Sequence, residues 1–374
     1  NKHMKKLISA LLVIAMLFAL AACAAPAATT ETTTETATEA TAAPAETVEA
    51  AKFVGISMPT QDLQRWNQDG ANMKEKFEAA GYKVDLQYAN NEVATQVSQI
   101  ENMISAGVNV LVIAAIDGKT LTQVLSTAKD ANIAVIAYDR LIMDTDAVNY
   151  YCTFDNYMVG TIQGQYIKDQ LKLDEGGSYN IEITAGDPAD NNALYFYQGA
   201  MDVIQPYIDS GVVTVPSGQV KFEEVATAAW STETSQSRME AILASFYADG
   251  TQLDACLCSN DSTAKGVTNA LASSYTGKYP IVTGQDCDIA NTKDIIAGKQ
   301  SMSIFKDTRT LAAQTVAMAS DILAGKTPEV NDTKSYDNGT GIIPTYLCAP
   351  VFADINNYKE LLIDSGYYTE DQLQ

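Results

Sequence analysis

The sequence predicts an α/β fold built from two domains, each containing a parallel sheet. From residue 53 onward, short apolar segments alternate with segments whose apolar residues have helical spacing. This alternation favours parallel strands joined by right-handed helical crossovers. The pattern pauses and then resumes after Asp155, which predicts a second sheet of the same type. The length of 374 residues fits two domains of the usual size, about 100–200 residues each.

Four strand–helix units predict the first domain. Its strands are expected at residues 53–57, 83–88, 110–113 and 133–137, with helices through Trp66, Met73 and Phe77 and at residues 94–106 and 121–131. The segment 110–113 is apolar on both faces, as a buried parallel strand should be. These units therefore predict a doubly wound sheet.

The second domain is predicted from a shorter series of the same elements. Its strands are expected at 180–184, 253–258 and 281–283, with helices at 192–207, 234–247 and 263–273. No glycine-rich phosphate-binding turn follows any of these strands, so neither a dinucleotide nor a nucleoside triphosphate is indicated. We therefore expect no cofactor, and a cleft between the domains that holds a small ligand.

The charge balance excludes several classes of function. The chain has 24 Lys and Arg against 46 Asp and Glu, a net charge of −22, which disfavours binding to nucleic acid and anionic lipid. The single histidine is His3, and we interpret residues 1–3, ahead of Met4, as a remnant of cloning. The natural chain would then lack histidine, which excludes catalytic triads, metal sites and proton shuttles that depend on it.

The N-terminal segment resembles the signal peptide of a bacterial lipoprotein. Lys5 and Lys6 precede an apolar run of 16 residues, 7–22, which is short for a membrane span of about 20 residues but typical of a signal peptide. The run ends in small residues followed by Cys23, so we expect lipidation at Cys23. The alternative is an ordinary signal peptide in which Cys23 is incidental. Residues 1–23 are assigned to the remnant and this signal peptide.

The composition of residues 24–51 predicts a disordered linker. These residues are almost entirely Ala, Thr, Glu and Pro, a composition that cannot bury enough apolar surface to offset the entropy of ordering.

Five further cysteines do not form a complete disulfide framework, because their number is odd. Cys256 and Cys258 alternate along an apolar strand, so we interpret them as buried free thiols rather than as a metal-binding pair. The thiol states are otherwise left open for Cys152, Cys287 and Cys348.

Polar residues follow several of the predicted strands at their carboxyl ends, where open α/β sheets bind ligands. Each could simply cap the following helix, but together they favour a binding site. Carboxylates accept hydrogen bonds from sugar hydroxyls, Arg, Lys and Asn donate to their oxygens, and aromatic rings cover the apolar face of a sugar. Trp66 and Trp230 are the candidate rings, with packing in the core as the alternative for each.

Particular segments resemble a known family. They are Arg65 and Trp66, QIENM at 99–103, AYDR at 137–140, TFDN at 153–156, DNNA at 190–193, SND at 259–261, GQD at 284–286 and GYYTEDQL at 366–373. These segments resemble the xylose-binding and multiple-monosaccharide-binding proteins of bacterial ABC importers. The likeness runs from about Lys52 almost to the C-terminus.

The resemblance implies a class I periplasmic-binding-protein fold, with two Rossmann-like lobes joined by three crossovers. It implies an N-terminal lobe of residues 52–154 with 306–333 and a C-terminal lobe of residues 155–305 with 334–374. The crossovers are expected near residues 153–156, 303–306 and between 327 and 341.

The resemblance also implies the sugar-binding residues. They are Arg65, Asp139, Arg140, Asp190, Asn192, Asn260, Asp286 and Lys306 as hydrogen-bonding groups, and Trp230 and Trp66 as aromatic walls. Related glucose- and galactose-binding proteins carry a calcium loop, but no matching run occurs in this sequence, so no metal is expected. The resemblance to binding proteins implies no catalytic residue.

The function implied is that of a lipid-anchored solute-binding protein outside the cytoplasm. It would capture an aldopentose or aldohexose, such as xylose, glucose, galactose or arabinose, and deliver it to an ABC permease. We expect a monomer that touches the membrane only through its lipid. The sugar, its anomer and the binding of acidic sugars stay open.

Three alternatives remain. A chemoreceptor or sensor protein would bind sugar without transport. A sugar-processing enzyme would use paired carboxylates as acid and base, although Arg140 and Lys306 would hold such carboxylates ionised. A sugar-responsive repressor would need an N-terminal helix-turn-helix and a basic surface, in place of the export signal and acidic charge found here.

Overall fold

The computed structural model describes residues 51–374. The predicted signal peptide, Cys23 and all but the last residue of the predicted linker lie outside the described residues. Among the residues that are described, no helix is both long enough and apolar enough to cross a membrane.

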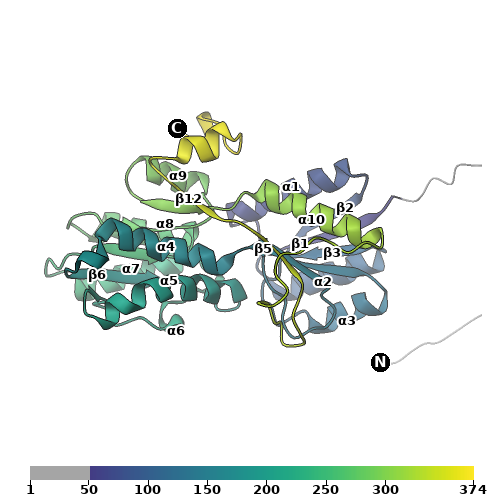
Figure 1. Cartoon of the computed structure of the whole chain (residues 1–374), viewed down its shortest axis with the longest axis horizontal. Helices are drawn as coiled ribbons and strands as arrows, with labels where there is room; N and C mark the ends of the chain where they lie inside the picture. The colour runs from purple at the N-terminus through teal and green to yellow at the C-terminus, as the bar shows by residue number, and fades with distance from the viewer. Residues whose placement is uncertain (1–50) are drawn as a thin grey trace, which may run out of the picture. The chain divides into compact units, whose positions relative to one another are not determined.

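A parallel sheet of six strands forms the centre of the first lobe, which we call lobe 1 (Figure 1). In sheet order the strands are β11 (Thr345–Cys348), β5 (Tyr150–Phe154), β4 (Ala134–Tyr138), β3 (Val110–Ile113), β1 (Phe53–Met58) and β2 (Lys83–Tyr88), and every adjacent pair is parallel. Its helices are α1 (Gln64–Ala79), α2 (Val93–Ser105), α3 (Thr122–Asp130) and α10 (Thr308–Leu323). Figure 1 shows α1 and α10, which are far apart in the sequence, packed side by side.

The two faces of this sheet are buried under different helices. Val110 and Val112 of β3 pack in a core with α1 and α10, whereas Leu111 and Ile113 pack in a core with α2 and α3. All four side chains are fully buried. The prediction that this strand is buried on both faces is therefore confirmed.

A second parallel sheet, with helices on both faces, forms the centre of lobe 2. Its strand order is β7 (Val213–Thr214), β6 (Tyr179–Thr184), β8 (Ala255–Cys258) and β9 (Ile281–Val282), and β10 (Met302–Phe305) pairs antiparallel with β12 (Val351–Asp354). Helices α4 (Asn156–Leu171) and α5 (Asn191–Asp209) pack together on one face, and α7 (Thr232–Phe246) and α8 (Asp261–Ser274) on the other. The shorter helices are η1 (Leu173–Glu175), α6 (Phe222–Val225), η2 (Ala228–Trp230), α9 (Ile289–Ile296), η3 (Lys359–Asp364) and η4 (Asp371–Leu373).

The chain passes between the lobes three times, and the third passage corrects an expectation from the sequence. The first two lie between β5 and α4 and between β10 and α10. The third lies between Cys348, the last residue of β11, and Val351, the first of β12. It was expected between residues 327 and 341, with 334–374 in the second lobe. That expectation is wrong for residues 334–348, because β11 pairs with β5 of lobe 1.

The physical reason is that clustered Pro and Gly residues indicate a loop but do not indicate which of the two lobes the loop packs against. Tyr336 and Ile343 are buried in the hydrophobic core of lobe 1. Asn338 donates two hydrogen bonds from its amide to the carbonyls of Ile142 and Thr145, also in lobe 1. The loop therefore packs on the first lobe at residues 336–343 before the chain crosses.

The described cysteines are buried and unpaired. Cys152, Cys256, Cys258, Cys287 and Cys348 are all free thiols in the described part of the chain. Burial raises the pKa of Cys258 to about 12, mainly because the thiolate would lose its hydration. Such thiols are chemically inert at neutral pH.

Candidate functional site

All ten residues that the sequence predicts for the ligand site line one cavity between the lobes. Its predicted lining residues are Arg65, Trp66, Asp139, Arg140, Asp190, Asn192, Trp230, Asn260, Asp286 and Lys306. Each of the polar side chains among them is at most 9% exposed. The two lobes are therefore closed around this cavity.

The carboxyl ends of the strands supply most of these side chains. In lobe 1, Asp139 and Arg140 directly follow β4, and Arg65 and Trp66 lie in the first turn of α1, the helix after β1. In lobe 2, most lining residues come from the segments after β6, β8 and β9, Trp230 lies in η2 after β7, and Lys306 directly follows β10. This placement agrees with the general position of ligand sites in open α/β sheets.

Three of the lining residues have a backbone conformation that side chains rarely adopt. Asp139 has φ 63°, Trp230 has φ 55° and Asp286 has φ 103°, all in the left-handed region. Non-glycine residues are held in this region only where the surrounding structure imposes it, and such strain concentrates at functional sites. The backbone thus directs these three side chains at the expense of local stability.

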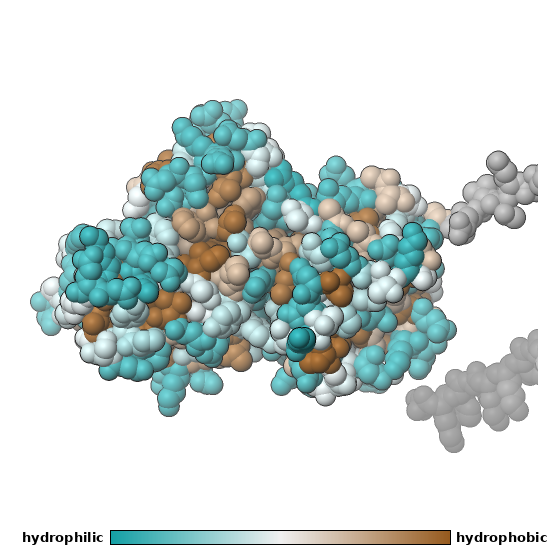
Figure 2. All heavy atoms as spheres, viewed as in Figure 1, coloured by the Kyte–Doolittle hydropathy of each residue, from teal (hydrophilic) through white to brown (hydrophobic). Residues whose placement is uncertain are grey.

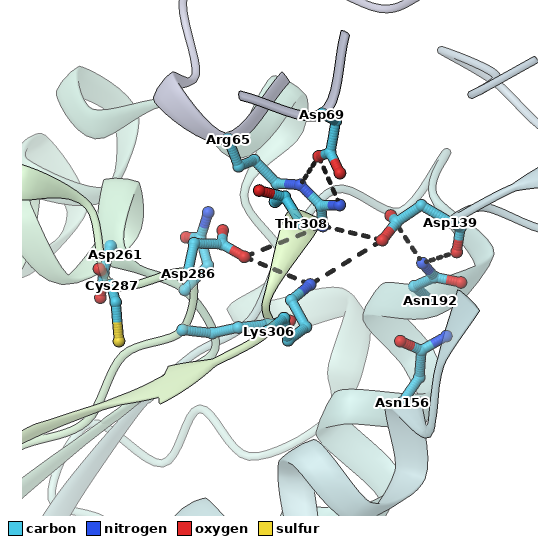
Figure 3. Close-up of polar contacts among 12 residues, drawn as sticks. Arg65, Asp69, Asp139, Asn156, Asn192, Asp261, Asp286, Cys287, Lys306 and Thr308 are labelled. Atoms are coloured by element: carbon cyan, nitrogen blue, oxygen red, sulfur yellow. Dashed lines mark hydrogen bonds and ion pairs between the residues drawn. The ribbon is translucent and has the colours of Figure 1, made fainter. Parts of the chain in front are cut away.

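Arg65 is the centre of the charged network in the cavity (Figure 3). Its guanidinium contacts Asp69 at 2.8 Å, one turn further along α1, and Asp139 at 2.8 Å. It also lies 3.9 Å from Asp286, which belongs to lobe 2. Lys306 contacts the same carboxylate of Asp286 at 3.2 Å.

The charges around Asp139 keep it ionised. Burial alone would raise its pKa, but Arg65, Lys306 and Arg140 outweigh burial and hold the pKa of Asp139 below its usual value. By contrast, burial raises the pKa of Asp190 above its usual value, although Arg140 opposes the rise. The cavity therefore contains at least one carboxylate that can only accept hydrogen bonds at neutral pH.

Two further contacts join the lobes at the wall of the cavity. Arg140 of lobe 1 forms an ion pair with Asp190 of lobe 2, with Nε and Oδ2 3.1 Å apart. Asn192 of lobe 2 donates a hydrogen bond of 2.6 Å to the backbone carbonyl of Asp139 in lobe 1. Both contacts are made by residues that the sequence predicts for the site.

The two tryptophans occupy different environments. The guanidinium carbons of Arg65 and Arg140 lie 4.3 and 5.0 Å from the centre of the Trp66 ring, which also packs in the core of lobe 1. The Trp66 Nε1 group is buried without a hydrogen-bond partner among residues 51–374. Trp230 packs edge-to-face with Phe196 at 6.0 Å and donates from Nε1 to Asp190 at 3.2 Å.

Sequence reasoning missed three residues that line the cavity and one behind it. Leu63, Phe196 and Gln285 line the cavity with the predicted ten, and Asp69 supports Arg65 from behind. Asp69 lies four residues after Arg65 in the predicted helix, so the i, i+4 spacing could have identified it. Phe196 lies at helical spacing from Asn192 and is indistinguishable by pattern from a core residue.

A larger and more apolar cavity lies between α4 and β12, and none of the predicted residues lines it. Figure 2 shows hydrophobic residues gathered on the surface near β12. The lining residues of this second cavity include Ile162, Tyr166, Val351 and Phe352.

The closed, polar cavity between the lobes is the candidate functional site, because the charged side chains of both lobes meet there. Within residues 51–374, no group of three or more His, Cys, Asp or Glu side chains is arranged to hold a metal ion.

Comparison with known proteins places this architecture among binding proteins. A sequence profile of the periplasmic binding protein domain matches residues 54–327. The multiple sugar-binding periplasmic protein SbpA of Azospirillum brasilense is 51% identical over 326 residues, which cover 86% of this chain and 91% of SbpA. The D-xylose-binding periplasmic protein of Escherichia coli strain K12 is 37% identical over 325 residues, which cover 86% of this chain and 93% of that protein.

A solved structure shares the fold of nearly the whole described chain. It is the crystal structure of an ABC transporter solute-binding protein from Clostridium phytofermentans with bound β-D-glucose. It superposes with a TM-score of 0.86 at 69% sequence identity, covering 86% of this chain and 100% of that chain. The predicted fold class and family resemblance are thereby confirmed.

Proposed function

Because the chain belongs to the periplasmic binding protein family, we propose that it is a solute-binding protein outside the cytoplasm that captures a monosaccharide between its lobes. The observation that supports this most directly is the cavity between the lobes, which is lined by charged, amide and aromatic side chains from both of them.

The chemistry of the lining matches the hydroxyl groups of a sugar. Asp139 and Asp286 offer carboxylate oxygens that accept hydrogen bonds, and Arg65, Arg140 and Lys306 offer donors. Each of these cations already contacts a carboxylate at 3.2 Å or less. The cavity therefore presents alternating donors and acceptors, which suits neighbouring hydroxyls that both donate and accept.

We propose binding without chemical turnover. Sugar hydrolysis needs a carboxylic acid that releases a proton near neutral pH. The pKa of Asp139 is held below its usual value by Arg65, Lys306 and Arg140 against the effect of burial, and Asp286 lies between Lys306 and Arg65. Burial raises the pKa of Asp190, but its carboxylate is already engaged by Arg140 at 3.1 Å and by the Trp230 indole at 3.2 Å. Sugar recovered after incubation with the protein should be unchanged.

The partner that receives the sugar is proposed to be an ABC permease, in keeping with the C. phytofermentans protein, whose description names it an ABC transporter solute-binding protein. A sensor that binds sugar without transport is the alternative. We propose that the protein is held at the outer face of the cytoplasmic membrane by a lipid on Cys23.

The test is calorimetric titration of the purified protein with D-glucose, D-xylose, D-galactose and L-arabinose. We expect saturable binding of at least one of them, and a rise in melting temperature. A ligand at about 100 times its Kd adds about 2.7 kcal/mol to the free energy of unfolding. Absence of heat and of a melting shift with every sugar would overturn the proposal.

A further inference from the structure

Gly186 lies directly behind the ring of Trp230. The residue is buried and is the second residue after the end of β6. A Cβ atom added at Gly186 would lie 2.0, 2.2 and 2.3 Å from Cη2, Cζ3 and Cζ2 of Trp230. Nearly equal distances to three consecutive carbons place that atom over the face of the six-membered ring. Carbon atoms in contact are normally about 3.5–4.0 Å apart, so the ring occupies this place only because residue 186 has no side chain.

Other contacts fix the ring on its remaining sides. The edge-to-face contact with Phe196 and the hydrogen bond from Nε1 to Asp190 hold the indole itself. Ser262 donates a hydrogen bond of 2.7 Å to the backbone carbonyl of Trp230, and Thr227 N donates one of 2.9 Å to the carbonyl of Gly186. The loop that carries Trp230 is thus hydrogen-bonded to the segment after β6 that contains Gly186. Trp230 and Gly186 therefore cannot move apart without breaking these hydrogen bonds.

We propose that Gly186 is a positioning residue that sets the depth of the ligand cavity by letting the Trp230 ring lie back against the main chain. A methyl group there would move the ring by roughly 1.5 Å, from 2.0 Å to ordinary contact distance. Since Trp230 lines the cavity, this movement reduces the space for a ligand against the ring. That the ligand is a monosaccharide rests on the proposed function.

The backbone at Gly186 does not itself require glycine. Its φ lies outside the left-handed region, so alanine adopts the same conformation without strain. Any effect of Gly186→Ala therefore comes from the contact with Trp230.

Gly277 provides a matched control. A Cβ there would lie 2.3 Å from the hydroxyl of Tyr275, and its φ is also outside the left-handed region. Gly277 is exposed and does not line the ligand cavity, and its crowded neighbour Tyr275 is held by a hydrogen bond from Leu253 N at 3.0 Å.

The experiment combines Gly186→Ala with Trp230→Phe, whose smaller ring lacks the outer edge of the indole. Calorimetry with D-glucose should show at least roughly a tenfold loss of affinity for Gly186→Ala, and less than about threefold for Gly277→Ala. In the Trp230→Phe background, adding Gly186→Ala should change affinity by less than about threefold. Should Gly186→Ala lower the melting temperature, Trp230→Phe should restore it.

A measurement without sugar separates this inference from the proposed function. The indole NH signal of Trp230, assigned by its absence in Trp230→Phe, should shift in the NMR spectrum of ligand-free Gly186→Ala and not in Gly277→Ala. An unmoved signal overturns the inference whether or not sugar binds. Equal losses in both Trp230 backgrounds also overturn it. A wild-type protein that binds no monosaccharide, with the signal shifted as expected, overturns the proposed function and leaves the role of Gly186 standing.

Discussion

Arg140 and Asp190 form a buried ion pair between the two lobes, with Nε and Oδ2 3.1 Å apart. Arg140 directly follows β4 of lobe 1, whereas Asp190 caps the first turn of α5 in lobe 2 by accepting from Asn192 N at 2.9 Å. An ion pair between lobes forms only when the lobes are close together. This pair therefore stabilises the closed arrangement and at the same time shapes the wall of the cavity.

Replacing Asp190 by asparagine should weaken sugar binding. Asparagine caps a helix as well as aspartate does, so α5 is expected to remain intact. Arg140 would lose the carboxylate that it contacts in the closed state, and truncating one partner of a buried pair typically costs about 2–5 kcal/mol. Calorimetry with D-glucose should therefore show roughly a thirtyfold loss of affinity or more.

Asp187→Asn is the control for this change. Asp187 lies in the same loop, and its carboxylate accepts only from Ala189 N among its contacts in the described structure. Affinity should stay close to that of the wild type. Equal losses in the Asp187 and Asp190 variants would mean that the loop, and not the ion pair, is responsible.

Removing the carboxylate of Asp286 should cost about 1.5–3 kcal/mol of binding free energy, or roughly tenfold to a hundredfold in affinity. The reason is that sugar hydroxyls in a closed cavity would lose their acceptor. Two variants separate this from backbone strain. Asp286→Ala keeps a side chain at φ 103°, whereas Asp286→Gly adopts that conformation freely.

A loss of affinity shared by Asp286→Ala and Asp286→Gly would come from the carboxylate. Asp249→Ala, at an exposed turn before β8, serves as the control, because its carboxylate contacts only Thr251 of the described residues. Unchanged affinity in both Asp286 variants would remove Asp286 from the site.

The sequence predicts the site well where a polar side chain follows a buried strand. Asp139, Asn260 and Asp286 are of this kind. A strand that is apolar on both faces has no polar residue of its own, so the first polar residues after it are easily recognised. Trp230 was also identifiable, because it lies in a polar stretch without apolar periodicity.

Elements that pack against two different neighbours, or against a partner distant in the sequence, could not be predicted from local patterns. Helix α4 packs between α5 and the ribbon of β10 and β12, so it lacks a single apolar face. Its Gln163 is 1% exposed and donates to the carbonyls of Ser259 and Gly284. Strand β11 is set by pairing with β5, nearly 200 residues earlier in the chain, and local sequence does not encode such a partner.

Asp69 should make the stability of the protein depend on pH. Burial raises its pKa to about 6, although Arg65 opposes the rise. A raised pKa means that the folded state binds the proton more tightly than the unfolded state. The free energy of unfolding should therefore fall as the pH rises from about 4 to 6, by up to about 3 kcal/mol.

The comparison of wild type with Asp69→Asn isolates this effect, because asparagine does not titrate. Urea unfolding at pH 4 and pH 7 should show the stability of the wild type, relative to the variant, decreasing with pH. A relative stability that increases with pH would mean that Arg65 keeps Asp69 ionised in acid.

Cys23 should determine attachment to the membrane. In the full-length protein produced in a bacterium, Cys23→Ser should abolish labelling by radioactive palmitate and move the protein from the membrane to the soluble fraction. A serine variant that stays labelled and membrane-bound contradicts the lipoprotein assignment. Sugar affinity of the variant, which should be unchanged, is the control for folding.

Sugar binding should bring the lobes together. Small-angle scattering is expected to show a smaller radius of gyration when D-glucose is added to the wild type, because the three crossovers permit a hinge motion between the lobes. In Asp190→Asn the decrease should require a higher sugar concentration. An identical scattering profile with and without saturating D-glucose would count against closure.

The late return of the chain to lobe 1 has a consequence for how the protein is made. Helix α10 and strand β11 lie at residues 308–323 and 345–348, and they supply Leu311, Met318 and Cys348 to a core otherwise built from residues 54–154. A chain still being synthesised thus has a first sheet with one edge unpaired and one face partly bare until almost its last residue. Long-range contacts of this kind form slowly. The first lobe therefore completes its fold only after β6 to β10 of the second lobe have been made, and the second lobe is itself completed last, by β12 and the C-terminal residues.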